Sequence, residues 1–128
     1  MFQNLMNENE ILKKIRKYSV EIYETLGAGY NECVYEEALA LELRKAKIDY
    51  EIERNTEIMY KGEKVGIHRL DFIVEGKIVI ELKAASSITN SNRSQLLSYL
   101  RTLNLKKGLL INFPYPDKEE PEIEEIFV

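Results

Sequence analysis

Residues 70–84 read LDFIVEGKIVIELKA, two apolar runs separated by a polar turn at Glu75-Gly76-Lys77. The runs are rich in β-branched residues and the turn contains glycine, which together predict a β-hairpin. Strands this apolar belong in the middle of a sheet that is covered on both faces. Ionised side chains are costly there unless they are paired, so Asp71, Glu81 and Lys83 need a physical explanation.

A bound divalent cation is the explanation that we favour. Magnesium prefers oxygen ligands and usually takes one or two carboxylates from the protein, keeping water or substrate phosphate as its other ligands. Asp71 and Glu81 would supply the carboxylates. Lys83 leaves the same face of its strand as Glu81, so it could orient the attacking water or stabilise charge on the phosphate. The group predicts a metal-dependent phosphodiesterase; the alternative is a structural ion-pair cluster.

The register of the hairpin decides whether Asp71 and Glu81 can act together. A two-residue loop at Glu75-Gly76 would pair Asp71 with Ile80 and direct the two carboxylates to opposite faces. A three-residue loop, or a bulge in either strand, would bring them to one face. We expect the three-residue loop because a metal needs converging ligands. That register pairs Asp71 with Glu81, Arg69 with Lys83 and Ile73 with Val79, and it directs His68 away from the site.

The composition is that of one globular domain. The chain has 128 residues, of which 45% are hydrophobic and 31% charged, and this is enough for a single core. No apolar run approaches the ~20 residues of a membrane span, and residues 1–10 lack a signal-peptide pattern. We therefore expect a cytoplasmic protein without membrane contact. The single cysteine, Cys33, cannot form an internal disulfide and is expected to be a small buried helix residue.

The charge of the chain is unevenly distributed. The net charge is -4, but residues 117–125 alone carry six acidic groups and one basic group, a net of -5, so residues 1–116 carry about +1. This balance permits a phosphate-containing substrate without indicating one. We expect residues 1–116 to form the domain and residues 117–128 to form an acidic C-terminal tail whose last three residues could dock on the core.

Hydrophobic periodicity predicts the order ααβββαβ and an α/β fold, a mixed sheet flanked by helices. In the second helix, Val34, Ala38 and Leu41 form the expected apolar side, with Tyr35, Leu39 and Ala46 beside it. The basic run in the first helix is interpreted as a solvated face, with a phosphate-facing patch as the alternative. The expected elements are two helices within residues 10–47, strands at 50–60, 64–74 and 77–84, a helix at 91–104 and a strand at 107–113.

The hairpin, with Asp71 followed by Glu81-Leu82-Lys83, resembles the D…ExK signature of the PD-(D/E)XK nuclease superfamily. A second stretch, GYNECVY at residues 29–35, is similar to the signature of the bacterial GxxExxY proteins, which are placed in the same superfamily. The resemblance continues through YEEALALELRK and QLLSYLRTLNLKKGLLINF and covers nearly the whole chain. One departure is Leu70, which stands where the superfamily often has proline. The resemblance implies a restriction-endonuclease-like fold and an Mg²⁺-dependent nuclease, with Mn²⁺ as a possible substitute and DNA as the expected substrate.

The resemblance also implies roles for further residues. Glu32 would complete the metal site from the N-terminal helices; its alternative role is that of an early helix acid favoured by the helix dipole. Tyr35 would either touch substrate or seal the core. Gln95 and Tyr99 are similar to a QxxxY element that lies beside the active site in some branches, or else they form the polar flank of a leucine stripe.

The resemblance leaves activity itself open, because the superfamily includes members that no longer cut. The alternative function is an inactive nuclease-fold module that binds nucleic acid or a protein partner. Homodimerisation is a further possibility. Retention of the acidic residues and the lysine favours the enzyme, whereas the small amount of basic surface favours the binding module.

Overall fold

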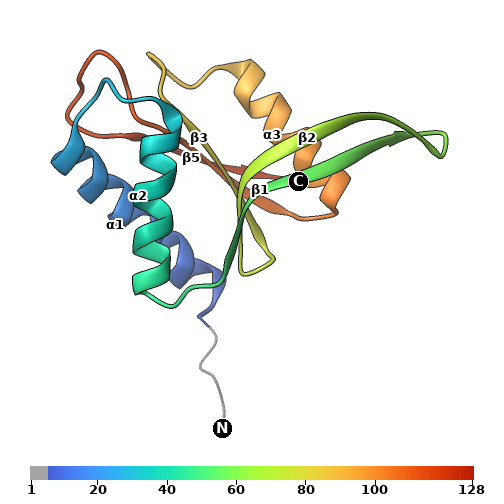
Figure 1. Cartoon of the computed structure of the whole chain (residues 1–128), viewed down its shortest axis with the longest axis horizontal. Coiled ribbons are helices and arrows are strands. Elements are labelled where there is room, and N and C mark those ends of the chain that lie inside the picture. The colour runs from blue at the N-terminus through green and yellow to red at the C-terminus, as the bar shows by residue number, and fades with distance from the viewer. Residues whose placement is uncertain (1–5) are drawn as a thin grey trace, which may run out of the picture.

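The computed structural model describes residues 6–128 and contains one mixed sheet with strand order β1-β2-β3-β4-β5 (Figure 1). β3 and β4 pair in parallel, and the other neighbouring strands are antiparallel. The expected α/β fold with a mixed sheet between helices is confirmed, and one strand is added at the C-terminal end of the expected order. The elements are α1 (Glu8–Leu26), α2 (Glu32–Lys45), β1 (Tyr50–Tyr60), β2 (Glu63–Val74), β3 (Ile78–Lys83), α3 (Asn90–Leu103), β4 (Lys107–Asn112) and β5 (Glu122–Phe127).

The added strand, β5, lies in the segment expected to be an acidic tail. It pairs antiparallel with β4, and Ile126 is buried against the α3 side of the sheet. Its acidic side chains have partners on both faces. Glu124 accepts a hydrogen bond from Arg93 of α3 at 2.7 Å, and Glu125 accepts one from Arg16 of α1 at 3.1 Å. Such partly exposed ion pairs contribute little, so the ladder with β4 and the burial of Ile126 are what hold this acidic segment in the sheet.

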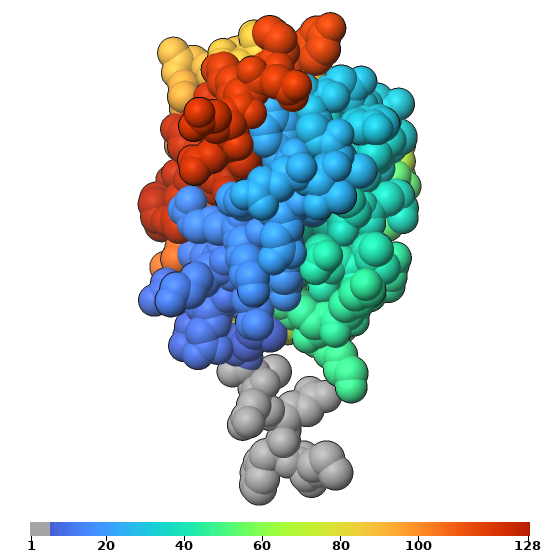
Figure 2. Space-filling view, turned by 90° about the vertical axis from the view of Figure 1, so that its left-hand side faces the viewer, coloured from blue at the N-terminus to red at the C-terminus, as the bar shows by residue number. Residues whose placement is uncertain are grey.

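α1 and α2 pack side by side over one face of the sheet (Figures 1 and 2). The buried side of α2 is not the expected Val34–Ala38–Leu41 stripe, because Leu41 is 43% exposed. The i, i+4, i+8 row through Tyr35, Leu39 and Leu43 faces the sheet instead. The core under these helices includes Ile11, Ile15, Leu39, Leu43, Phe72, Ile80, Leu82 and Ile111.

α3 covers the opposite face and connects the parallel strands β3 and β4. Leu96, Tyr99 and Leu100 of α3 form a second core with Ile73 and Val79 of the hairpin. No helix in residues 6–128 is long and apolar enough to cross a membrane.

The β2–β3 hairpin has the register that we expected. Ile73 pairs with Val79, and Val74 pairs with Ile78 across the three-residue loop. Glu75 and Gly76 in this loop have φ values of 53° and 65°, a conformation that glycine adopts without steric cost. The loop therefore directs Asp71 and Glu81 to the same face of the hairpin.

Three loops meet at one end of the molecule, where β3 ends and α2 begins (Figure 1). The α1–α2 loop is tied to the β4–β5 loop by a hydrogen bond from the Ala28 amide to Asp117 Oδ1 at 3.0 Å. Asn112, which is buried, ties the β3–α3 loop to the sheet. Its side chain accepts a hydrogen bond from the Ala85 amide and donates one to the Ala85 carbonyl, both at 2.9 Å, and it also donates to Glu122 at 2.8 Å.

Replacing this buried amide should destabilise the fold measurably. We expect Asn112→Ala to lower the free energy of unfolding by about 1–3 kcal/mol, because its hydrogen-bond partners lose a buried connection. Urea unfolding followed by circular dichroism measures the change. Asn55→Ala, at an exposed position of β1, is the matched control and should stay within about 0.5 kcal/mol of wild type. Equal losses in the two variants would contradict the role assigned to Asn112.

Candidate functional site

Asp71 and Glu81 lie where β2 and β3 separate. The last backbone pair of the two strands is Phe72 with Ile80. Beyond this pair, backbone amides of the two strands donate hydrogen bonds to the side-chain carboxylates. Asp71 Oδ2 accepts a hydrogen bond from the Leu82 amide at 2.7 Å, and Glu81 Oε1 accepts one from the Asp71 amide at 3.4 Å. The two side chains therefore lie next to each other, oriented by backbone donors.

These two carboxylates are held in an unfavourable electrostatic setting. Burial and then the charge of Asp71 raise the pKa of Glu81 to about 8. Burial also raises the pKa of Asp71, against the opposing effects of the Leu82 amide and Lys83. Two desolvated acids that repel each other are stabilised by a cation placed between them. The pair is thus suited to binding positive charge.

Glu32 and Lys83 approach the same region from different elements. Lys83 is half-buried at the end of β3, two residues after Glu81. Burial raises the pKa of Glu32, while the charge of Lys83 lowers it and that of Asp71 raises it. Glu32, the first residue of α2, therefore lies within electrostatic range of the pair.

An open hollow of about 510 Å³ lies between the start of α2 and the end of β3. Glu32 lines it, as does Ala84, the residue directly after Lys83. Cys33 also lines it and is exposed, so the expectation of a buried cysteine was wrong. The Cys33 thiol contacts Asn31 Oδ1 at 2.6 Å. Of the acids near the site, Glu32 is the one that faces this hollow.

Glu36 is a further acid of this region that the sequence analysis missed. It lies one helical turn after Glu32 and is buried. Burial, followed by the charges of Asp71 and Glu53, raises the pKa of Glu36 to about 7. The available signal was its position next to Tyr35 and one turn before Ala40, where an acid interrupts an apolar face. Choosing the wrong apolar face of the helix concealed it.

Arg69 and Tyr99 flank the acids. The exposed Arg69 pairs with Glu53 at 2.7 Å, and its charge lowers the pKa values of Glu36 and Asp71. Burial, then the charges of Glu81 and Asp71, raise the pKa of Tyr99 to about 12.

The other two candidates lie on the α3 side of the sheet. Gln95, one turn before Tyr99, is exposed on α3. The His68 ring packs edge-on against the ring of Tyr99, with centroids 4.0 Å apart, and burial lowers the pKa of His68. His68 is thus placed against Tyr99 of α3.

The GxxExxY stretch has a structural explanation. Gly29 has a φ of 103°, which disfavours any residue with a side chain. Tyr35 is fully buried, stacks on Phe113 with centroids 4.2 Å apart, and donates its hydroxyl to the Gly27 carbonyl at 2.7 Å. This placement favours the core-sealing role of Tyr35 and fixes the loop that positions Glu32.

The donor set suits an ion such as magnesium or manganese that is held by few protein ligands, rather than an ion that protein side chains enclose. Within residues 6–128, no three His, Cys, Asp or Glu side chains lie close enough together to enclose an ion. Two carboxylates and an open hollow match an ion that retains water and takes ligands from its substrate. Asp71 and Glu81 would be its protein ligands, with Glu32 next in reach.

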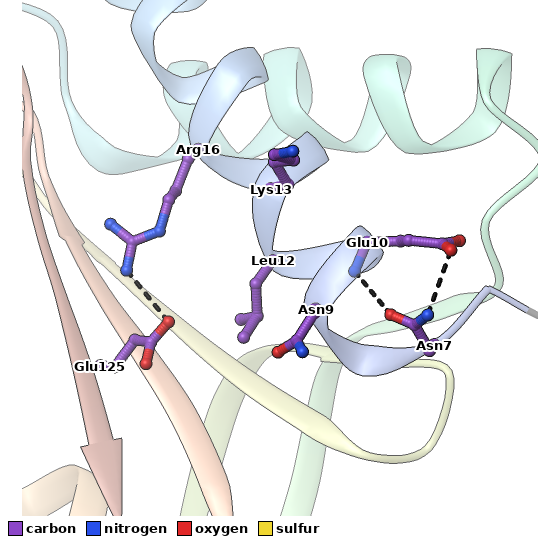
Figure 3. A pocket seen from close by; sticks show the side chains of 7 residues that line it. All are labelled: Asn7, Asn9, Glu10, Leu12, Lys13, Arg16 and Glu125. Atoms are coloured by element: carbon purple, nitrogen blue, oxygen red, sulfur yellow. Dashed lines mark hydrogen bonds and ion pairs between the residues drawn. The ribbon is translucent and has the colours of Figure 1, made fainter.

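A second hollow, of about 370 Å³, lies at the other end of α1, between its first turns and β5 (Figure 3). Its carboxylates already have partners there: Glu10 hydrogen-bonds Asn7, and Glu125 pairs with Arg16 (Figure 3). α2 runs back along α1, so the start of α2 is far from this hollow (Figure 1). It is separate from the acidic site.

The raised pKa values predict a stability that depends on pH. The folded-state pKa of Glu81, about 8, lies above its ordinary value of 4.5, so the folded state binds more protons than the unfolded state between these limits. Stability should therefore fall as pH rises from about 4.5 to about 8 in metal-free buffer. Thermal unfolding in the presence of a chelator measures this trend.

Glu81→Gln should weaken that dependence and raise the melting temperature near pH 8, since the variant has no charge to desolvate. Glu24→Gln, at an exposed position of α1, is the control and should retain the wild-type slope. A Glu81→Gln slope equal to that of wild type would show that Glu81 is not the titrating group.

Comparisons with known proteins agree with this architecture. A family model described as the PD-(D/E)XK nuclease superfamily matches residues 9–126. Among solved structures, the one titled "Crystal structure of SSO0001" is similar with a TM-score of 0.55 and 21% identity, over 98% of this chain and 70% of that chain. This likeness shows the fold alone, and the comparison with curated proteins found no match. Because the family model spans nearly all of the chain, the protein belongs to the PD-(D/E)XK nuclease superfamily.

Proposed function

We propose that this protein is a magnesium- or manganese-dependent nuclease that hydrolyses phosphodiester bonds in DNA, within the GxxExxY branch of its superfamily. The observation that carries the proposal is the convergence of Asp71 and Glu81 beside Lys83. Burial disfavours the charged forms of both carboxylates, so a bound cation would stabilise the site. The superfamily membership makes nucleic acid the expected substrate.

In this proposal, Asp71 and Glu81 hold the ion and Glu32 assists from α2. The ion would supply a Lewis acid for the phosphate and lower the pKa of a bound water. The Leu82 and Asp71 amides hold the two carboxylates in place, so little reorganisation is needed on binding.

Lys83 acts on the reacting groups rather than on the ion. Its ammonium group, on the same strand face as Glu81, orients the attacking water or neutralises charge that grows on the phosphate. The open hollow beside Glu32 admits the nucleic-acid backbone. Arg69 and Gln95 are exposed at the flanks, where they can contact substrate, whereas Tyr99 and Tyr35 support the site from the core.

Glu36 has the protonation behaviour of a proton acceptor at neutral pH. Its pKa, about 7, is matched to the pH at which a general base works best. We assign Glu36 to proton transfer from the water or to holding a water bound to the ion.

The alternative function is an inactive module that binds nucleic acid or a protein partner. The observation in its favour is that one oxygen of each carboxylate already accepts a backbone hydrogen bond. In such a module these bonds would serve the fold alone. Metal binding separates the two functions, because only the enzyme requires it.

Substitution of the lysine should separate chemistry from metal binding. Lys83→Ala is expected to reduce cleavage by at least about 10²-fold while leaving Mn²⁺ affinity largely intact, whereas Asp71→Ala should lose both. Plasmid and oligonucleotide cleavage assays and titration calorimetry with Mn²⁺ provide the two measurements. Lys77→Ala, in the exposed hairpin loop, is the matched control. Equal Mn²⁺ affinity in wild type and Asp71→Ala would show a structural ion-pair cluster instead.

The buried helix acid offers an independent test. Glu36→Gln keeps the size of the side chain but cannot accept a proton, so the rate should fall by about 10-fold or more near neutral pH. The pH–rate profile should also lose a limb near the pKa of Glu36, about 7. Glu24→Gln, at an exposed position of α1, is the control and should cleave at the wild-type rate. An unchanged profile in Glu36→Gln would remove Glu36 from the chemistry.

A further inference from the structure

Glu53, in the middle of β1, has a backbone conformation that strands normally exclude. Its φ is 53°, in the left-handed region, where the Cβ atom of any residue other than glycine is crowded. The other non-glycine residues with positive φ in residues 6–128 lie in turns. Such outliers persist where the surrounding structure holds them in place, and they gather at functional sites. The conformation of Glu53 thus needs a physical reason.

Glu53 stands across the ladder from Asp71, at the point where the β1–β2 ribbon turns over. It follows Ile52, which pairs with Phe72, and both of these pack on the α1–α2 side of the sheet. Leu70, only two residues from Phe72, packs on the α3 side instead. Residues two apart on a regular strand share a face. The ribbon therefore exchanges its faces at Glu53 and Asp71, before it projects past α3 (Figure 1).

The side chain of Glu53 pairs with Arg69, two residues before Asp71 on β2. Oε1 of Glu53 lies 2.7 Å from Nη2 of Arg69, and the two side chains are 49% and 63% exposed. An ion pair as exposed as this contributes little to stability. A left-handed backbone costs a residue that has a Cβ more than such a pair returns. Stability therefore does not explain why a glutamate stands here.

Both members of the ion pair act on the acidic site. After burial and the charge of Asp71, the charge of Glu53 is the next contribution that raises the pKa of Glu36. The charge of Arg69 lowers the pKa of Glu36 and, against burial, that of Asp71. Arg69 is thus within electrostatic range of these acids and still accessible to solvent. A guanidinium has several N–H donors, so it can pair with a carboxylate and bind a phosphate oxygen at the same time.

We infer that Glu53 is a positioning residue of the site: its carboxylate holds the guanidinium of Arg69 near Asp71, where the guanidinium receives a phosphate of the DNA backbone. The inference rests on the proposed function, because it takes DNA as the ligand. The kink at Glu53 supplies the geometry, since the ribbon turns over where Asp71 enters the site. An arginine that is already held loses less conformational entropy on binding phosphate than a free one does. Glu53 acts through Arg69 and touches neither phosphate nor ion.

DNA binding without cleavage tests this inference. The reference is the full chain with Lys83→Ala, in Mn²⁺, and its affinity for a labelled DNA duplex is measured by fluorescence anisotropy at several salt concentrations. Adding Arg69→Gln should raise the Kd by about tenfold and lower the salt dependence by about one phosphate contact. Adding Glu53→Gln should raise the Kd by about three- to tenfold. The two together should bind no more weakly than Arg69→Gln does, because Glu53 acts through Arg69.

The sign of the Glu53→Gln effect is decisive. Removing a carboxylate that only repels DNA would lower the Kd, since phosphates are negatively charged. A positioning carboxylate must raise the Kd when it is removed. Glu57→Gln, at an exposed acid of the same strand with an ordinary φ, is the matched control and should not raise the Kd.

Glycine at position 53 separates the backbone from the carboxylate. Glycine adopts a positive φ without steric cost, so Glu53→Gly should raise the melting temperature by about 2–5 °C. It should nevertheless weaken DNA binding as much as Glu53→Gln does, a combination that damaged folding cannot produce. Glu57→Gly, in regular strand backbone, should lower the melting temperature. A Glu53→Gly variant less stable than wild type would show that the glutamate serves the fold, and would overturn the inference.

The inference is also overturned if Glu53→Gln leaves the Kd unchanged or lowers it, or if its effect simply adds to that of Arg69→Gln. These results would leave the proposed nuclease standing, because Asp71, Glu81 and Lys83 would still bind Mn²⁺ and cleave. A chain that shows the coupling in DNA binding but never cleaves would remove the nuclease function and retain the inference. A reference chain that does not bind DNA would overturn both.

Discussion

The arrangement of the acidic site depends on one constraint, the register of the β2–β3 hairpin. Side chains alternate between faces along a strand, so a slip of one residue would separate Asp71 from Glu81 across the sheet. The three-residue loop after Val74 prevents that slip, with Glu75 and Gly76 both in the left-handed region. The apolar residues that flank the loop bury on both faces and reinforce the same register. A local turn thus sets the geometry of a distant pair of charges.

The rest of the fold surrounds this pair with groups that change its charge state. α2 brings Glu32 and Glu36 from one side, and α3 brings Tyr99 from the other. Lys83 and Arg69 are the cations whose charges lower the pKa values of these acids, and two positive charges do not balance the four carboxyls. The cost of burying these carboxylates together raises their pKa values, because protonation removes the repulsion between them. A divalent ion would relieve it in another way, which links the electrostatics of the resting fold to the chemistry that we propose.

The body and the β1–β2 arm, residues 57–67, use apolar residues differently. In the body, two helices on one face and one helix on the other leave few large hydrophobic side chains in solvent. The arm has no such cover, because β3 ends before it can pair with the outer part of β2.

The sequence by itself determined the central hairpin, the helices on both faces and the register that brings Asp71 beside Glu81, because alternation and turn chemistry are local properties. It did not reveal β5, since acids at 122, 124 and 125 mask a strand whose charges find arginine partners only after folding. Nor did it reveal Glu36, whose importance depends on which side of α2 meets the sheet. Both sides of α2 carried plausible apolar rows, and a helix propensity does not choose between them. Only tertiary packing made that choice, because burial depends on the surface opposite each row and not on the row alone.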